Sequence, residues 1–198
     1  MEEHRSDREI IIDILSKAFG ENPRVLSTIK KGRTDERIRI MANYAYDLVE
    51  RQNGVFFSSD STTAMLYYRK SLKKMDLAQT LRYLRMIFRT IRPLKALVTL
   101  KREKMIDRLR EDPSDYIYVW LLGAIPGNRS LKGLIEVRDH LALLQEKYHL
   151  PILIETTLEK MLKLYQYVGF EIYHTWEDES TGITVWFLKR PYHQPEIS

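Results

Sequence analysis

The sequence predicts a mixed α/β protein with a mostly antiparallel central sheet, built around one parallel β-α-β unit and flanked by helices. Two nearly continuous apolar runs, 116–125 and 150–156, enclose a long amphipathic segment. Such runs are typical of strands buried on both faces. A strand, a helix and a second strand in this order imply a right-handed parallel crossover. Shorter strand-like segments paired around polar turns lie on either side and predict antiparallel edges.

Composition limits the classes of function. The 198 residues, 44% hydrophobic and 30% charged, suit a globular chain of one domain. The absence of cysteine excludes disulfides, thiolate zinc sites and a cysteine nucleophile. The five histidines show no metal-ligand spacing, so we expect no metal site. The N-terminus lacks signal-peptide features, and no apolar run approaches the roughly 20 residues that span a bilayer. We therefore expect a cytoplasmic protein without a membrane partner.

The N-terminal part predicts two helices and a hairpin. Residues 7–23 place Ile11, Ile12, Leu15 and Phe19 at helical spacing. A second helix is predicted over 34–54, with Thr34 as its N-cap. Residues 54–60 and 62–70 then read as two strands around a short polar turn.

Positive charge is concentrated in the next segment. Residues 69–110 hold 14 Lys or Arg against 3 Asp or Glu, whereas the remainder of the chain is acidic. Two stripes about 100° apart are predicted on one helix. The apolar stripe, expected to face the core, is Leu81, Leu84, Phe88 and Ile91, and the basic stripe is Arg82, Arg85, Arg89 and Arg92.

The basic stripe has two readings, a solvated helix face or a contact with an anionic partner. The sequence argues against nucleic acid, because it shows neither a recognised binding module nor interleaved stacking aromatics. A second helix is predicted after Pro93.

The C-terminal half alternates strands and helices. After the strand 116–125, an apolar stripe predicts a helix with a core-facing row: Leu131, Leu134, Val137, Leu141 and Leu144. A strand over 150–156, a short helix ending at Gly169 and two strands, 170–176 and 183–190, follow. The last strand is long and apolar, and pairing across a homodimer is one option for it.

Four segments of this half carry a resemblance to a known family: "YIYVWLLGAIP", "GNRSLKGL", "LPILIETT" and "LYQYVGFEIYHTW". The most specific match is Leu164, Tyr165, Gly169 and Phe170. The chain resembles the GCN5-related N-acetyltransferase superfamily, in a subgroup with a helical insertion before the central strand. The resemblance implies one domain over 1–198, with the basic helical insertion at about 71–112 and an acyl-CoA-binding core at about 116–190.

The resemblance also implies an activity and site residues. The activity is transfer of acetyl from acetyl-CoA, a co-substrate, to a small-molecule or peptide amine. Tyr165 would protonate the departing thiolate. The pantetheine arm would pair with the backbone of Leu122, Gly123 and Ala124 as an added strand does. The diphosphate would bind at the start of the following helix, where unpaired N–H groups and the helix dipole favour an anion. This segment comprises Arg129, Ser130, Leu131, Lys132, Gly133 and Leu134.

Other readings remain open. Tyr165 is also interpretable as a packed aromatic near a helix end. Glu155, at the end of a buried strand, is either a base for the attacking amine or a member of a structural ion pair or solvated strand end. The loop departs from the family pattern, because its second small residue is replaced by Leu134 or Ile135, depending on one gap. The alternative function is therefore a catalytically weak or inactive binding protein on the same fold, whose basic lobe contacts an acidic partner.

Overall fold

The computed structural model describes residues 5–73, 76–110, 115–128, 130–179 and 181–192. The N-terminal part contains three helices and a hairpin: α1 (Asp7–Phe19), α2 (Pro23–Thr28), α3 (Thr34–Glu50), β1 (Val55–Phe57) and β2 (Thr63–Arg69). The short 3-10 turn η1 (Lys70–Leu72) leads to α4 (Leu77–Thr90) and α5 (Pro93–Leu109). The rest comprises β3 (Ile117–Ala124), α6 (Lys132–Tyr148), β4 (Ile152–Thr156), η2 (Glu159–Met161), α7 (Leu162–Tyr167), β5 (Glu171–Asp178) and β6 (Ile183–Arg190).

The strands form one six-stranded sheet in the order β1-β2-β3-β4-β6-β5. Only β3 and β4 are parallel, and every other neighbouring pair is antiparallel. The predicted fold class is therefore confirmed, with the parallel pair joined through α6. Strand β6 lies between β4 and β5, so both of its edges are already paired. No edge of strand 183–190 is therefore open for pairing with a second copy, and the possible homodimer stays a prediction.

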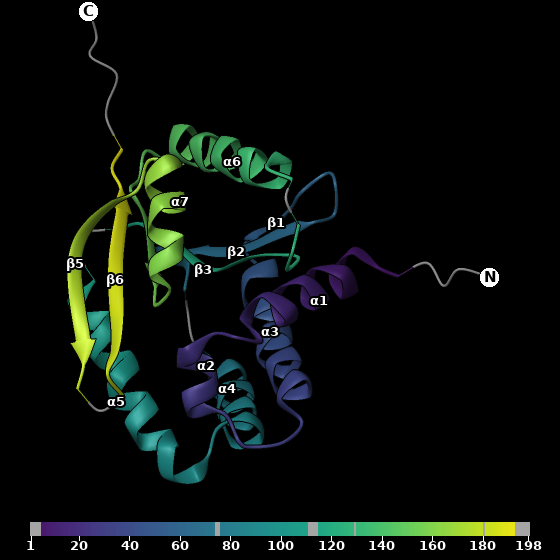
Figure 1. Cartoon of the computed structure of the whole chain (residues 1–198), viewed down its shortest axis with the longest axis vertical. Coiled ribbons are helices and arrows are strands. Elements are labelled where there is room, and N and C mark those ends of the chain that lie inside the picture. Colours follow the sequence, from purple (N-terminus) through teal and green to yellow (C-terminus); the bar gives the residue numbers. More distant parts are fainter. Residues whose placement is uncertain (1–4, 74–75, 111–114, 129, 180, 193–198) are drawn as a thin grey trace, which may run out of the picture.

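Helices cover both faces of the sheet (Figure 1). One face packs on α1 and α3 through a core that includes Leu15, Val49 and Tyr118. The other face packs on α6 and α7, with Val137 and Tyr165 in that core. Helix α4 lies outside α3, and α5 crosses β5 and β6, where Ile106 is fully buried with Val185 and Phe187.

The N-terminal helices begin at capping signals of different kinds. Ser6 and Glu9 form a reciprocal capping box on α1. Helix α2, which the sequence patterns did not predict, begins at Pro23 after the cap Asn22, whose side chain accepts from the N–H groups of Arg24 and Val25. The expected N-cap Thr34 is wrong by one residue. The cap of α3 is Arg33, at φ 48°, with no side-chain hydrogen bond.

Helix α4 is rotated relative to the prediction. Ile91 is buried as expected, but Leu81, Leu84 and Phe88 are 59%, 39% and 69% exposed. The face against α3 carries Met86 and Ile87 instead. Because α4 has two apolar faces, periodicity identifies the helix but not the face that is covered. A similar correction applies to Leu131, which caps α6 and is 64% exposed, whereas the next members of its predicted row are partly or fully buried.

Candidate active site

The two parallel strands separate after three paired positions. Ile117, Tyr118 and Val119 pair with residues 152–154 of β4, and the pairing ends there. Beyond this point β3 continues to Ala124 paired with β2, while β4 continues paired with β6. The register with β2 passes from Val119 directly to Leu121, so Trp120 is the extra residue of a bulge. The β4 side of residues 120–124 is thus an edge to which an extended ligand can add.

Leu122, Gly123 and Ala124 lie on this part of β3, as the predicted pantetheine contact requires. Gly123 also has a packing role. A Cβ built there would lie 2.7 Å from Ala18 Cβ and 3.4 Å from Leu15 Cδ2. The missing side chain therefore lets α1 approach the strand closely.

The loop after β3 ends at the N-terminus of α6. Arg129 lies outside the described residues. Ser130 donates its N–H to Asn128 Oδ1 and accepts from the N–H of Lys132 through its hydroxyl. The side chain of the N-cap Leu131 accepts no N–H of the first turn, whereas the cap side chains of α1, α2 and α4 each accept at least one. The Ser130 hydroxyl thus takes up the N–H of Lys132, whereas among the described residues no side chain accepts from the N–H of Gly133 or Leu134, at the end where the dipole favours an anion.

The two small positions of the loop have different surroundings. Gly133 is buried, and a Cβ there would lie 2.2 Å from Thr63 Oγ1, so this glycine allows the helix to contact β2. Leu134 packs against the core between the sheet and α6, and Ile135 is 40% exposed. Lys132 Nζ, at the first helical position, lies 4.0 Å from Glu136 Oε1. A lysine cation thus stands at the helix start.

Tyr165 lies in the core beside the point where β3 and β4 separate. It is 5% exposed and shares a cluster with Val119 and Ile154, the last paired residues of the two strands. Its ring meets Phe170 edge to face. Burial raises the pKa of the phenol well above its usual value, so the hydroxyl keeps its proton at neutral pH.

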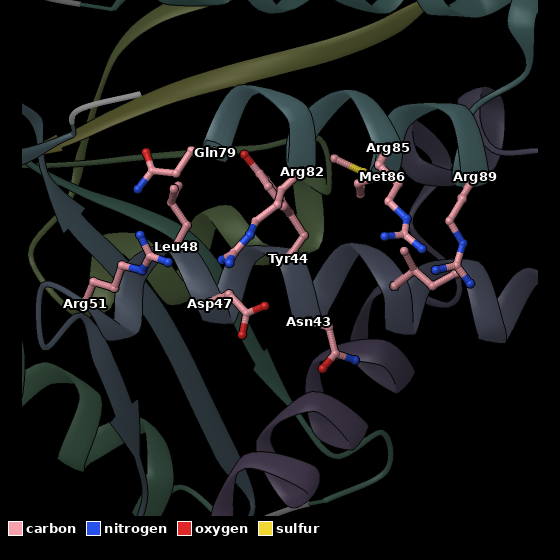
Figure 2. Close-up of a pocket in the computed structure, with 11 residues that line it drawn as sticks. Asn43, Tyr44, Asp47, Leu48, Arg51, Gln79, Arg82, Arg85, Met86 and Arg89 are labelled. Carbon is pink, nitrogen blue, oxygen red and sulfur yellow. The ribbon is translucent and has the colours of Figure 1, made fainter. Parts of the chain in front are cut away.

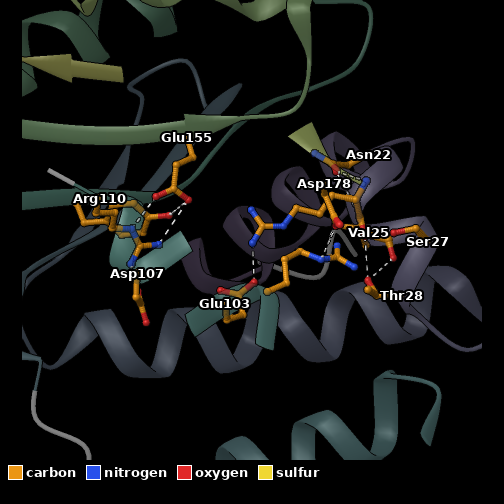
Figure 3. A network of polar contacts seen from close by, with 12 residues as sticks. Asn22, Val25, Ser27, Thr28, Glu103, Asp107, Arg110, Glu155 and Asp178 are labelled. Carbon is orange, nitrogen blue, oxygen red and sulfur yellow. Dashed lines mark hydrogen bonds and ion pairs between the residues drawn. The ribbon is translucent and has the colours of Figure 1, made fainter. Parts of the chain in front are cut away.

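Glu155 lies in a buried polar network on the α5 side of the sheet (Figure 3). Arg110 Nε donates to Glu155 Oε1 at 2.6 Å, and the Tyr118 hydroxyl donates to Oε2 at 3.0 Å. The side chains of Arg110 and Glu155 are 8% and 4% exposed. Burial alone would lower the pKa of Arg110, but Tyr118 and Glu155 outweigh it and the pKa is raised. Asp107 also pairs with Arg110.

The sequence patterns did not identify Arg110 and Tyr118 as partners of Glu155. Their positions lie 45 and 37 residues before it, on elements that only the tertiary fold brings together. A second pair in the same region, Arg24 and Glu103, joins α2 to α5 at 2.5 Å. Thr157, just after β4, holds a buried hydroxyl without a hydrogen-bond partner. No local signal marks any of these residues.

An apolar cavity of about 90 Å³ lies on the α1–α3 side of the bulge. Trp120 and Leu121 of β3 line it together with apolar residues of the four N-terminal helices that surround it. Tyr44 and Met86 also line a larger groove between α3 and α4, so they form a wall common to both spaces.

Solved structures share this architecture. An acetyltransferase from Corynebacterium glutamicum, described as histone acetyltransferase HPA2 and related acetyltransferase, aligns over 100% of this chain and 97% of its own, with TM-score 0.65 and 16% identity. The Drosophila melanogaster polyamine N-acetyltransferase aligns over 92% and 94%, with TM-score 0.54 and 13% identity. Arylalkylamine N-acetyltransferase 2 from Aedes aegypti aligns over 96% and 98%, with TM-score 0.55 and 11% identity. The chain has the GCN5-related N-acetyltransferase fold.

No protein-family model matches the sequence, and no curated protein matches it at a significant level. The acetyltransferase fold also occurs in the C-terminal condensation domain of Ebony, in a complex with beta-alanyl-dopamine, at TM-score 0.59 and 11% identity. Within the described part of the chain, no helix is long and apolar enough to cross a bilayer.

The residues present fit an acyl-CoA. The open side of β3 offers backbone groups to the pantetheine amides, and in the described part of the chain the N–H groups of Gly133 and Leu134 at the α6 N-terminus donate to no side chain. Leu134 does not fill the diphosphate position, because its side chain packs into the core. The orphan hydroxyl of Thr157 supplies a further polar atom near the strand ends.

Proposed function

We propose that this protein is an acetyl-CoA-dependent N-acetyltransferase that acylates a primary amine. The observation that carries the proposal is the separation of β3 and β4 after three paired residues, beside the start of α6, where the N–H groups of Gly133 and Leu134 have no side-chain cap among the described residues. The strand edge can bind an extended amide-bearing arm, and the helix start can bind its diphosphate. Both features lie in one loop-connected unit, 117–148.

In the proposed reaction the amine nitrogen attacks the thioester carbonyl, a C–N bond forms and the C–S bond breaks. Tyr165 donates its phenolic proton to the departing sulfur. The phenol must carry this proton before the reaction, and it does so because burial raises its pKa. The attacking amine loses its proton to solvent or to a base. Glu155 stays a candidate for that base, although Arg110 and Tyr118 already engage its carboxylate.

Thermal melting with acetyl-CoA tests the binding step. At about 1,000 times its dissociation constant, a ligand specific to the native state adds about 4 kcal/mol of stability. S-acetylpantetheine, which lacks the diphosphate, should raise the melting temperature less than acetyl-CoA does. In Lys132→Glu, the rises in melting temperature with the two compounds should be more alike. Lys104→Glu, an exposed change on α5, is the matched control. An unchanged melting temperature at millimolar acetyl-CoA would refute the proposal and leave the non-catalytic alternative.

Thiol release with a panel of amines tests the chemical step. The panel includes a polyamine, an arylalkylamine and a peptide with a free N-terminus. Tyr165→Phe should keep the acetyl-CoA shift and lower turnover by about 10²-fold or more. Tyr167→Phe removes a hydroxyl from the same helix at a side chain 68% exposed and should leave turnover unchanged. Equal turnover in both variants would exclude Tyr165 as the acid.

A further inference from the structure

A groove of about 490 Å³ runs between α3 and α4, on the opposite face of the sheet from α6. Four arginines line it: Arg82, Arg85 and Arg89 from α4, and Arg51 from the end of α3. Figure 2 shows the three α4 guanidinium groups reaching toward α3. The volume lies in the range of ligand-binding sites. Because α6 is on the other face, this groove is separate from the proposed diphosphate site.

The groove has unbalanced positive charge. Among the described residues, none of its four arginines lies within 4.0 Å of a carboxylate. Asp47 is the one acidic residue in the described lining, and its carboxylate lies 2.7 Å from the guanidinium group of Arg8. Like charges three and four residues apart destabilise a helix slightly. An anionic partner would relieve this repulsion along the whole row.

The spacing of the arginine row, Arg82, Arg85 and Arg89, favours an extended ligand with several negative charges. With about 1.5 Å of rise per residue, Arg82 and Arg89 are separated by about 10 Å along α4, with Arg85 between them. In an extended peptide, side chains on one face recur about every 6.7 Å. Three carboxylates at alternate positions of such a peptide span about 13 Å, slightly more than the row, and the long arginine side chains can spread to form a bidentate pair with each of them.

The rest of the lining favours a peptide over other polyanions. Gln79 Oε1 is buried and has no hydrogen-bond partner, so a turn of this side chain into the groove would let it accept from a peptide N–H, a donor that a phosphodiester backbone lacks. The floor includes the aliphatic Ile40, Leu48 and Met86. The aromatic residue Tyr44 packs against Tyr83 and Trp120, with ring centroids 5.8 and 6.2 Å apart, rather than standing free for a base.

We propose that the α3–α4 groove binds an extended acidic peptide segment of a partner protein. Its alternate carboxylates pair with Arg82, Arg85 and Arg89, and a backbone N–H donates to Gln79. The intervening apolar side chains cover the floor. A second copy docked through the same groove is a poor occupant, because a two-fold interface would place the two arginine rows against each other. The inference is independent of acetyl transfer.

Fluorescence anisotropy with a labelled peptide of alternating Glu and Leu tests the proposal at about 0.15 M salt. We expect saturable binding that weakens with salt, and about tenfold or greater loss in Arg85→Glu/Arg89→Glu and in the milder Arg85→Gln/Arg89→Gln. Lys104→Glu/Arg108→Glu, on exposed positions of α5, changes the net charge as much as the first variant and should lose little affinity. Circular dichroism checks that each variant is folded.

Three comparison probes identify the partner class: the same peptide with Gln for Glu, an oligothymidylate, and phosphatidylglycerol vesicles. The proposal requires the Gln peptide to bind at least about tenfold more weakly, and the other two probes to bind more weakly than the acidic peptide. Preferred binding of the oligonucleotide or the vesicles would overturn it. So would equal losses in the groove and control variants, or no binding of the acidic peptide.

Discussion

Gly123 combines a proposed ligand contact with a close approach of two elements. Replacing it with Ala would place the new Cβ 2.7 Å from Ala18 Cβ. We expect Gly123→Ala to lower the free energy of unfolding by about 1–3 kcal/mol through overpacking. Ala18→Gly alone should lower it by about 0.5–1 kcal/mol, because glycine weakens a helix. In the double variant the losses should not add, since the contact is gone.

Urea unfolding of all four proteins measures this coupling, which should be about 1 kcal/mol in favour of the double variant. Additive losses would show that Gly123→Ala destabilises the protein through the strand itself and not through the contact with α1. The glycine was predictable as a site residue from the resemblance. Its packing against α1 was not, because nothing local in the sequence relates positions 18 and 123.

Helix α4 shows the limit of periodicity at the element scale. Three of its four predicted core residues are exposed because a second apolar row, including Met86 and Ile87, packs on α3. We therefore expect Leu81→Gln and Phe88→Gln each to change the free energy of unfolding by less than about 0.5 kcal/mol. Ile87→Gln should lower it by about 2 kcal/mol or more, because it buries an amide in an apolar contact.

Chemical denaturation of the three single variants distinguishes the two orientations of α4. A larger loss in Phe88→Gln than in Ile87→Gln would favour the orientation predicted from the sequence. The strands and the helices near both ends were predictable because each has one dominant apolar pattern. Helix α2 was not, since its six residues are too few to show a period.

At the scale of the whole molecule, ion pairs and a small core tie α5 to the rest of the chain. Arg102 pairs with Asp178 on β5, Glu103 with Arg24 on α2, and Arg110 with Glu155 on β4. Ile106 is fully buried between them. These contacts join the predicted insertion to α2 and to the β4-β6-β5 half of the sheet, so we expect it to unfold together with the sheet.

Glu155→Gln tests the contribution of the Arg110–Glu155 ion pair to stability and, in the same protein, the catalytic role of the carboxylate. Removing one partner of a buried ion pair leaves the other charge unpaired, which lowers the free energy of unfolding by about 3–5 kcal/mol. Because Asp107 still pairs with Arg110 in this variant, we expect a loss of about 2–3 kcal/mol. Glu159→Gln, an exposed change just after β4, should have little effect. If Glu155 is structural, the variant unfolds at lower urea concentration but its folded fraction keeps the wild-type pH dependence of turnover. If Glu155 is also the base, the variant loses the same stability and the turnover of its folded fraction falls as well.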